Sequence, residues 1–135
     1  MSNHSIPRVG QFMTRTPYTI DHDQPLASAH ALMRAHQIRH LPVLQNGKLL
    51  GLVSVRDLHL IETLRDVDPS EVPVEDAMAE EPYTVSPEEP LDAVAAIMAD
   101  HKISSAVIVD SGEVQGIFTT VDALRALLHM WRSAR

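Results

Sequence analysis

The 135-residue chain contains no cysteine, so it can form neither a disulfide nor a thiolate metal site. It also lacks any run of about 18 apolar residues, and its polar residues 1–8 have no apolar core, so neither a membrane span nor a secretory signal is visible. Basic residues are few, 11 against 18 acidic ones, and the formal charge of -7 disfavours nonspecific binding to nucleic acid or anionic membranes. We therefore expect a cytoplasmic protein with no nucleic-acid or membrane partner.

Motifs of several enzyme classes are missing too. The sequence has no Walker loop, no nucleophile elbow and no HExxH helix. It does have eight histidines, but only His36 and His40 show helix-like ligand spacing, and the helix they would need should already have ended there. We expect no catalytic residues and no metal site.

The strongest feature that is present is an internal repeat at an offset of 65 positions. Matching pairs include Met13 and Met78, Tyr18 and Tyr83, Met33 and Met98, His36 and His101, and Asp57 and Asp122. One register kept without gaps over roughly 50 positions marks two copies of one supersecondary unit. Each copy is too small to bury an adequate core alone, so we expect the copies to pack together.

The hydrophobic pattern changes in the same order in both copies, and the first copy illustrates it. An apolar stretch at residues 9–13 leads to a brief strand at 18–20, and Pro25 then opens a helix that ends near His36. Two β-rich runs follow, 41–44 and 49–54, on either side of an Asn-Gly hairpin turn. A second helix, from Val55 to about residue 64, closes the copy. The sequence predicts an α/β fold in which a β-α-β-β-α unit occurs twice.

These patterns also predict the boundaries of the parts. We expect a flexible N-terminus at 1–8, repeats at 9–65 and 74–132, a linker at 66–73, and a tail at 133–135.

Each copy closes with glycine, two hydrophobic residues, serine or threonine, and an aspartate three residues later. The pairs are Ser54 with Asp57 and Thr119 with Asp122. Such a pair can be a capping box at a helix N-terminus, which needs no ligand. It can also be a nucleoside site, in which the carboxylate accepts hydrogen bonds from a ribose diol while the hydroxyl and helix amides face a phosphate. The local spacing leaves both interpretations open.

Taken in order, these features resemble a pair of cystathionine-beta-synthase (CBS) domains, the Bateman module. The resemblance rests on a Met-x-x-x-Pro opening in each copy, the segment Leu41-Pro42-Val43, and the doubled closing motif, and it covers about residues 9–130. It implies a regulatory module without catalysis or a required cofactor. Modules of this family bind adenosine-containing ligands such as AMP, ADP, ATP or S-adenosylmethionine between their copies and regulate a partner domain or protein.

The resemblance further implies two clefts, each joining the closing motif of one copy to the opening strand and pre-hairpin loop of the other. The first cleft would comprise Thr16, Pro17, Tyr18, Arg39, His40, Leu41, Pro42, Thr119 and Asp122. The second would comprise Ser54, Arg56, Asp57, Pro82, Tyr83, Ser104, Ser105 and Ala106. Arg39 and His40 resemble the phosphate-contacting residues of nucleotide-sensing members, and the second cleft lacks such a pair. We therefore expect the first cleft to be the occupied one.

The last predicted helix carries more apolar residues than one packing face requires. Its large apolar residues are Val121, Leu124, Leu127, Leu128, Met130 and Trp131. Some should belong to the core, and the rest indicate a partner surface. Because stand-alone modules of the family commonly dimerise through these helices, we expect a homodimer. The alternative function is a constitutive dimerisation module whose clefts hold no nucleotide.

Overall fold

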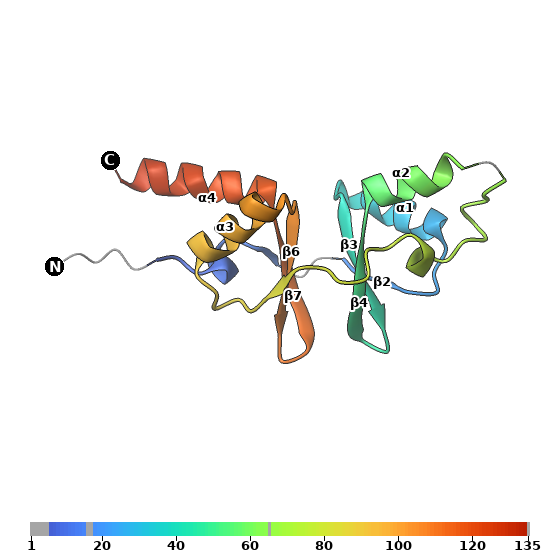
Figure 1. Cartoon of the computed structure of the whole chain (residues 1–135), viewed down its shortest axis with the longest axis horizontal. Helices are drawn as coiled ribbons and strands as arrows, with labels where there is room; N and C mark the ends of the chain where they lie inside the picture. The colour runs from blue at the N-terminus through green and yellow to red at the C-terminus, as the bar shows by residue number, and fades with distance from the viewer. Residues whose placement is uncertain (1–5, 16–17, 65, 135) are drawn as a thin grey trace. The chain divides into compact units, whose positions relative to one another are not determined.

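The computed structural model describes residues 6–15, 18–64 and 66–134. The chain forms two compact units, each with helices packed on a small β-sheet (Figure 1). Unit 1 contains the described residues of Met1–Thr16 and Tyr83–Arg135, and unit 2 those of Pro17–Pro82. The architecture confirms the predicted α/β class and the order of elements in both copies.

Unit 2 is built from most of the first copy and the opening segment of the second. Its elements are β2 (Ile20–Asp21), α1 (Leu26–His36), β3 (His40–Gln45), β4 (Lys48–Ser54), α2 (Val55–Glu62) and the short 3₁₀ helix η2 (Val74–Asp76). Strand β3 pairs in parallel with β2 and antiparallel with β4. The core of this unit includes Leu26, Leu41 and Leu58, all fully buried.

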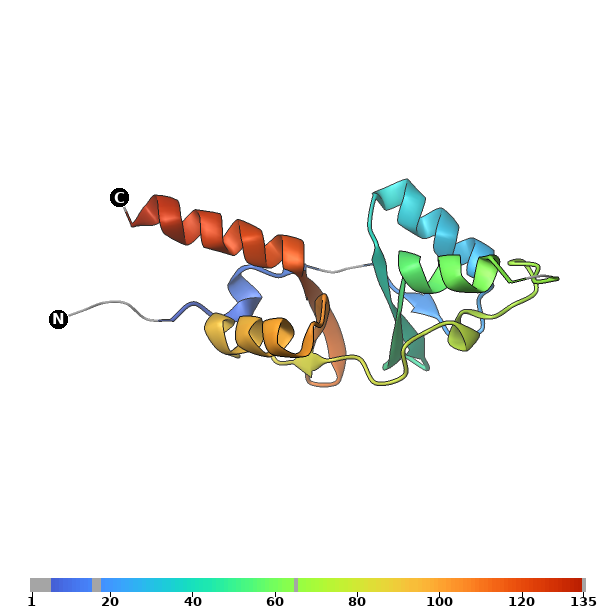
Figure 2. The same cartoon turned by 45° about the horizontal axis from the view of Figure 1, so that its top comes forward.

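Unit 1 is built from the second copy and the start of the chain. Its elements are η1 (Val9–Gln11), β1 (Thr14–Arg15), β5 (Thr84–Val85), α3 (Leu91–His101), β6 (Ser105–Asp110), β7 (Glu113–Thr119) and α4 (Thr120–Ser133). Its sheet has the strand order β1-β7-β6-β5, and Phe118 is the largest fully buried side chain. Figure 2 shows α3 and α4 on this sheet. None of the described helices is long and apolar enough to cross a membrane.

Local sequence explains most element ends. Pro25 and Pro90 are the N-cap residues of α1 and α3, where a fixed proline φ suits the entry to a helix. The predicted hairpin turns are confirmed: Asn46-Gly47 joins β3 to β4, and Ser111-Gly112 joins β6 to β7. All four turn residues have positive φ, as both central residues of a type I′ hairpin turn do.

The opening segment of each copy packs in the unit formed by the other copy. Val9 is fully buried in the core of unit 1, whereas its repeat equivalent Val74 is fully buried in the core of unit 2. Strand β1 pairs with β7, and the equivalent bridge in unit 2 joins Ala79 to Leu52. The sequence pattern predicted these segments but neither strand β1 nor this exchange.

Candidate functional site

Both closing motifs form capping boxes. In unit 2 the Ser54 hydroxyl accepts from the Asp57 N–H at 3.1 Å, and the Ser54 N–H donates to Asp57 Oδ2 at 2.9 Å. In unit 1 the Asp122 N–H donates to the Thr119 hydroxyl at 3.3 Å, and the Thr119 N–H donates to Asp122 Oδ2 at 2.9 Å. Each box satisfies backbone donors that a helix N-terminus otherwise leaves unpaired.

The two carboxylates differ in their remaining neighbours. Asp122 is only 4% exposed, and it also accepts a hydrogen bond from the Thr14 hydroxyl of β1 at 3.1 Å. The Arg125 guanidinium lies 3.8 Å from its Oδ1. Asp57 is partly exposed, and both of its recorded hydrogen bonds from the Ser54 hydroxyl and N–H end on Oδ2. Within the described ranges, Oδ1 of Asp57 receives no hydrogen bond.

The pre-hairpin loop lies beside the cap of its own copy. His40 is paired with Ser54 in the sheet register, and the Arg39 carbonyl accepts from the Val55 N–H at 2.9 Å. The second copy repeats this arrangement: Ser105 is paired with Thr119, and the Ser104 carbonyl accepts from the Thr120 N–H at 3.1 Å.

Besides Arg125 beside Asp122, the basic residues near these caps are Arg39, His40 and Arg56. Arg39 is exposed and makes no ion pair with any described acidic residue. The same is true of exposed Arg56, although it is adjacent to Asp57. Burial lowers the pKa of His40 below its ordinary value, the Asp57 carboxylate opposes this shift, and Arg39 adds to it. His40 is therefore mainly neutral near pH 7.

The other predicted site residues have varied environments. Leu41, Pro42 and Ala106 are buried, and Leu41 and Ala106 belong to the hydrophobic cores of their units. Tyr18 is exposed and stacks on His36, with ring centroids 3.6 Å apart and planes 9° from parallel. Burial raises the pKa of Tyr83, and Glu89 adds to the shift. Pro82 is half-buried, and Ser104 is exposed.

Thr16 and Pro17 lie outside the described residues. The rest of the first predicted cleft is divided between the units, with Tyr18 and residues 39–42 in unit 2 and Thr119 and Asp122 in unit 1. The second predicted cleft draws on both units in the same way. The crosswise composition of the two clefts stays a prediction.

Metal binding finds no support in the described ranges, since no three His, Asp or Glu side chains gather there as a ligand set. His22 instead contacts a single carboxylate, with Nδ1 2.8 Å from Glu75 Oε2.

The apolar stripe of α4 is exposed. Trp131 is 69% exposed and Leu124 is 60% exposed, and all six apolar residues named for this helix lie on the surface. The expectation that some of them belong to the core was wrong, because Ala126, Ala123 and Asp122 occupy the inward positions of α4.

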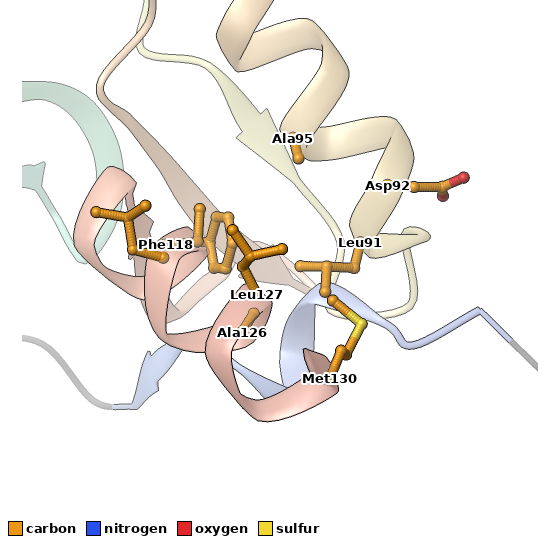
Figure 3. A pocket seen from close by; sticks show the side chains of 9 residues that line it. Leu91, Asp92, Ala95, Phe118, Ala126, Leu127 and Met130 are labelled. Atoms are coloured by element: carbon orange, nitrogen blue, oxygen red, sulfur yellow. The ribbon is translucent and has the colours of Figure 1, made fainter. Parts of the chain in front are cut away.

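A groove of about 340 Å³ separates α3 from α4. Leu91, Phe118 and Met130 converge on it, while the Asp92 carboxylate points away (Figure 3). Three small residues in its lining explain why it opens. Ala95, Ala123 and Ala126 stand where the first copy has the larger His30, Leu58 and Ile61.

Thr14 of β1 and Arg125 of α4 are neighbours of the Asp122 cap that sequence reasoning missed. A two-residue strand has too little periodicity to predict, so its pairing with β7 could not be foreseen. A signal was nevertheless present, because the repeat equivalent of Thr14 is Ala79, a polar-to-apolar change inside an otherwise matched segment.

Curated and solved proteins resemble the chain over most of its length. An inosine-5'-monophosphate dehydrogenase of Korarchaeum cryptofilum is 34% identical over 119 residues, which are 87% of this chain but 24% of that enzyme. The chain thus spans about a quarter of the dehydrogenases it matches. AcuB of Vibrio cholerae has a structure with a TM-score of 0.84, at 32% identity and 95% coverage of both chains.

Two further structures contain ligands. The CBS domain pair of protein MJ0100, in complex with 5'-methylthioadenosine and S-adenosyl-L-methionine, has a TM-score of 0.81 at 26% identity, covering 93% of this chain and 99% of that one. CBSX2 in complex with AMP also has a TM-score of 0.81, at 25% identity, covering 92% of this chain and 98% of that one.

The CBS-domain family model matches the chain twice, at residues 9–60 and 74–129. These two matches contain both capping boxes and both hairpins described above. The chain therefore belongs to the CBS-domain family and carries a tandem pair of its domains.

Proposed function

We propose that this CBS pair is a regulatory module that binds an adenosine-containing ligand, AMP, ADP, ATP or S-adenosylmethionine, and transmits its binding to a partner domain or protein. The observation that carries the proposal is the Ser/Thr-Asp cap at the start of both α2 and α4. Each cap places a carboxylate beside helix N-terminal amides, and these groups suit a ribose diol and a phosphate. The cytoplasm stays the predicted compartment.

The ligands of related structures support the adenosyl class. CBSX2 is in complex with AMP, and the MJ0100 pair is in complex with S-adenosyl-L-methionine and 5'-methylthioadenosine. An adenosine moiety is the part that these ligands share. We therefore expect this chain to recognise the adenosine moiety. The group attached to the 5' carbon should then determine which of these ligands binds most tightly.

The exposed guanidinium of Arg39 supports a phosphate-bearing ligand. It is free of ion pairs with the described acids, so its charge is available to a ligand in a chain of formal charge -7. We retain the first cleft, with Arg39 and His40 opposite Thr119 and Asp122, as the preferred site for a nucleotide. We expect the second cleft, with Ser54, Arg56 and Asp57, to bind a phosphate-bearing ligand more weakly.

A second function, constitutive homodimerisation, is favoured by a different observation. The exposed apolar residues of α4 lie next to the groove between α3 and α4, and its lining includes Leu124, Leu127 and Met130. Contiguous apolar surface of this kind usually marks a contact. Dimerisation is compatible with ligand binding, and it becomes the whole function if no adenosyl ligand binds.

Calorimetric titration of the parent protein and its aspartate variants tests the proposal. Loss of an ionised acceptor in Asp122→Ala should weaken binding of AMP by roughly tenfold or more, since a hydrogen bond to a charged group contributes about 1.5 to 3 kcal/mol. Asp57→Ala should weaken it less. Asp100→Ala, an exposed change on α3, serves as the control. If AMP, ATP and S-adenosylmethionine all fail to bind below about millimolar, the function is constitutive dimerisation.

A further inference from the structure

The two closing aspartates receive different numbers of hydrogen bonds from their own units. The Asp57 carboxylate accepts two, from the N–H and hydroxyl of Ser54, and both end on Oδ2. The Asp122 carboxylate accepts the equivalent two from Thr119 and a further one from the Thr14 hydroxyl. The difference in hydrogen bonding between the two carboxylates is therefore the hydroxyl of Thr14, while the exposed Arg125, whose repeat equivalent is Leu60, adds an ion-pair contact of 3.8 Å at Asp122.

Thr14 and Ala79 occupy the same place in their respective units. Thr14 is the register partner of Ile117 on β7, and Ala79 bridges to Leu52, the repeat equivalent of Ile117, on β4. The backbone therefore passes each cap in the same way, and the methyl side chain of Ala79 simply lacks the hydroxyl. This explains why Oδ1 of Asp57 receives no donor from the described residues of unit 2.

The hydroxyl of Thr14 occupies the part of Asp122 that a ribose would need. A carboxylate offers about four lone-pair sites, and the N-cap residue already uses two of them on Oδ2. A ribose diol brings two donors, which Oδ1 of Asp57 can accept. At Asp122, Thr14 Oγ1 lies 3.1 Å from Oδ1 and 3.4 Å from Oδ2, so one diol hydroxyl must compete with it.

We propose that Thr14 is a specificity-determining residue that weakens ribose binding through Asp122, while Ala79 leaves Asp57 open to the diol. This inference rests on the proposed function. Arg39 and His40 should raise the affinity of the Asp122 cleft for a nucleotide, whereas Thr14 should lower it. The residues Thr14 and Ala79 thus bring the ligand affinities of the two clefts closer together. Adenosine, which has no phosphate, should therefore favour the Asp57 site more strongly than AMP does.

The test inactivates one aspartate at a time and then removes the hydroxyl at Thr14 or introduces one at Ala79. In an Asp57→Asn background, where binding depends on Asp122, Thr14→Val should tighten adenosine and AMP binding by about two- to tenfold, the range for one net hydrogen bond. Thr14→Ser keeps the hydroxyl and should leave affinity unchanged. In an Asp122→Asn background, Ala79→Thr should weaken binding by a similar factor. Thr14→Ala serves as a second variant without the hydroxyl, and circular dichroism checks the fold of each protein.

The sign of the change decides the outcome. If Thr14→Val and Thr14→Ala weaken binding or leave it unchanged in the Asp57→Asn background, the hydroxyl does not compete with the ligand and the inference is overturned. If the parent protein binds neither adenosine nor AMP, the inference about Thr14 is overturned, and if it binds neither ATP nor S-adenosylmethionine either, the proposed function itself fails. The two failures are distinguishable because only the second leaves the parent protein without binding to any of these ligands.

Discussion

Asp57 and Asp122 occupy equivalent positions, yet the side chains around them differ. Asp122 is buried and accepts from Thr14 and Thr119, whereas Asp57 is partly exposed and accepts from Ser54 alone. The spacing of their motif offered the capping role of both residues as one of two interpretations, and the structure contains both capping boxes. The sequence could not predict the Thr14 contact, because that contact depends on a pairing between residues 108 positions apart.

The burial of Asp122 gives a stability prediction. Asp122→Ala leaves the Thr14 hydroxyl and the Thr119 N–H without their acceptor, so it should lower the free energy of unfolding by about 2 to 4 kcal/mol. Asp57→Ala should cost about 1 to 2 kcal/mol, because it removes a more exposed cap. Urea unfolding measures both values. Equal losses in the two variants would mean that the Thr14 contact adds nothing to stability.

His40 gives a prediction for pH. Its pKa is lowered in the folded protein, so below about pH 6.5, the ordinary imidazole pKa, the unfolded chain binds a proton that the folded chain resists. Stability from this group is therefore present above about pH 6.5 and is lost as the pH falls through the folded pKa.

The variant His40→Gln removes the titrating imidazole and with it this dependence of stability on pH. Between about pH 7.5 and about pH 5.5 it should lose less thermal stability than the parent protein does. His59→Gln, at an exposed position on α2, is the matched control and should follow the parent protein. A His40→Gln variant that loses as much stability as the parent protein would refute the role of His40.

At the scale of elements, the sequence predicted helices better than short strands. Helices α1 and α3 begin directly after Pro25 and Pro90 and end at His36 and His101, as the pattern indicated. Strand β1 has only two residues, and its place depends on β7. Sequence similarity defines the borders of the two repeats. The opening segment of each repeat packs in the unit formed by the other repeat, so the borders of the compact units could not be predicted from the repeat alone.

Gly116 lies on β7 where this strand pairs with β1, opposite Arg15. A Cβ at this position would lie 2.5 Å from the Thr14 carbonyl oxygen, which is backbone and cannot rotate away. Gly116→Ala should therefore displace β1 and cost about 1 to 3 kcal/mol of stability. Gln115→Ala, at the preceding half-buried position, should cost less. Denaturant unfolding compares the variants, and an unchanged midpoint for Gly116→Ala would show that β1 does not approach β7 this closely.

At the scale of the whole molecule, the sequence correctly indicated membership of the CBS family and a repeated fold. It overestimated how much of α4 belongs to the core, because small residues at Ala123 and Ala126 face inward and leave the large apolar side chains outside. Amphipathic periodicity identifies an apolar stripe, but it does not say whether the stripe meets the same chain or another one.

The exposed stripe predicts a homodimer with twice the 14.9 kDa mass of one chain at micromolar concentration. Two copies meeting on α4 could bury the roughly 1,200 to 2,000 Å² of a specific interface. The double variant Leu128→Ala and Trp131→Ala should weaken the dimer, because both side chains are large and exposed. Light scattering measures the mass. A monomer mass for the parent protein, with or without nucleotide, would rule out the homodimer.

The central claim, that adenosyl ligands bind at the caps of α2 and α4, is tested most directly by a two-dimensional NMR titration of the full chain with AMP, using cytidine monophosphate as the control nucleotide. We predict saturable shifts for AMP below about millimolar, concentrated at Arg39, His40 and the amides that begin α2 and α4, because a bound phosphate and ribose lie against those groups. Cytidine monophosphate should produce much smaller shifts. An absence of AMP shifts, or shifts confined to the hairpin turns at Gly47 and Gly112, would contradict the claim.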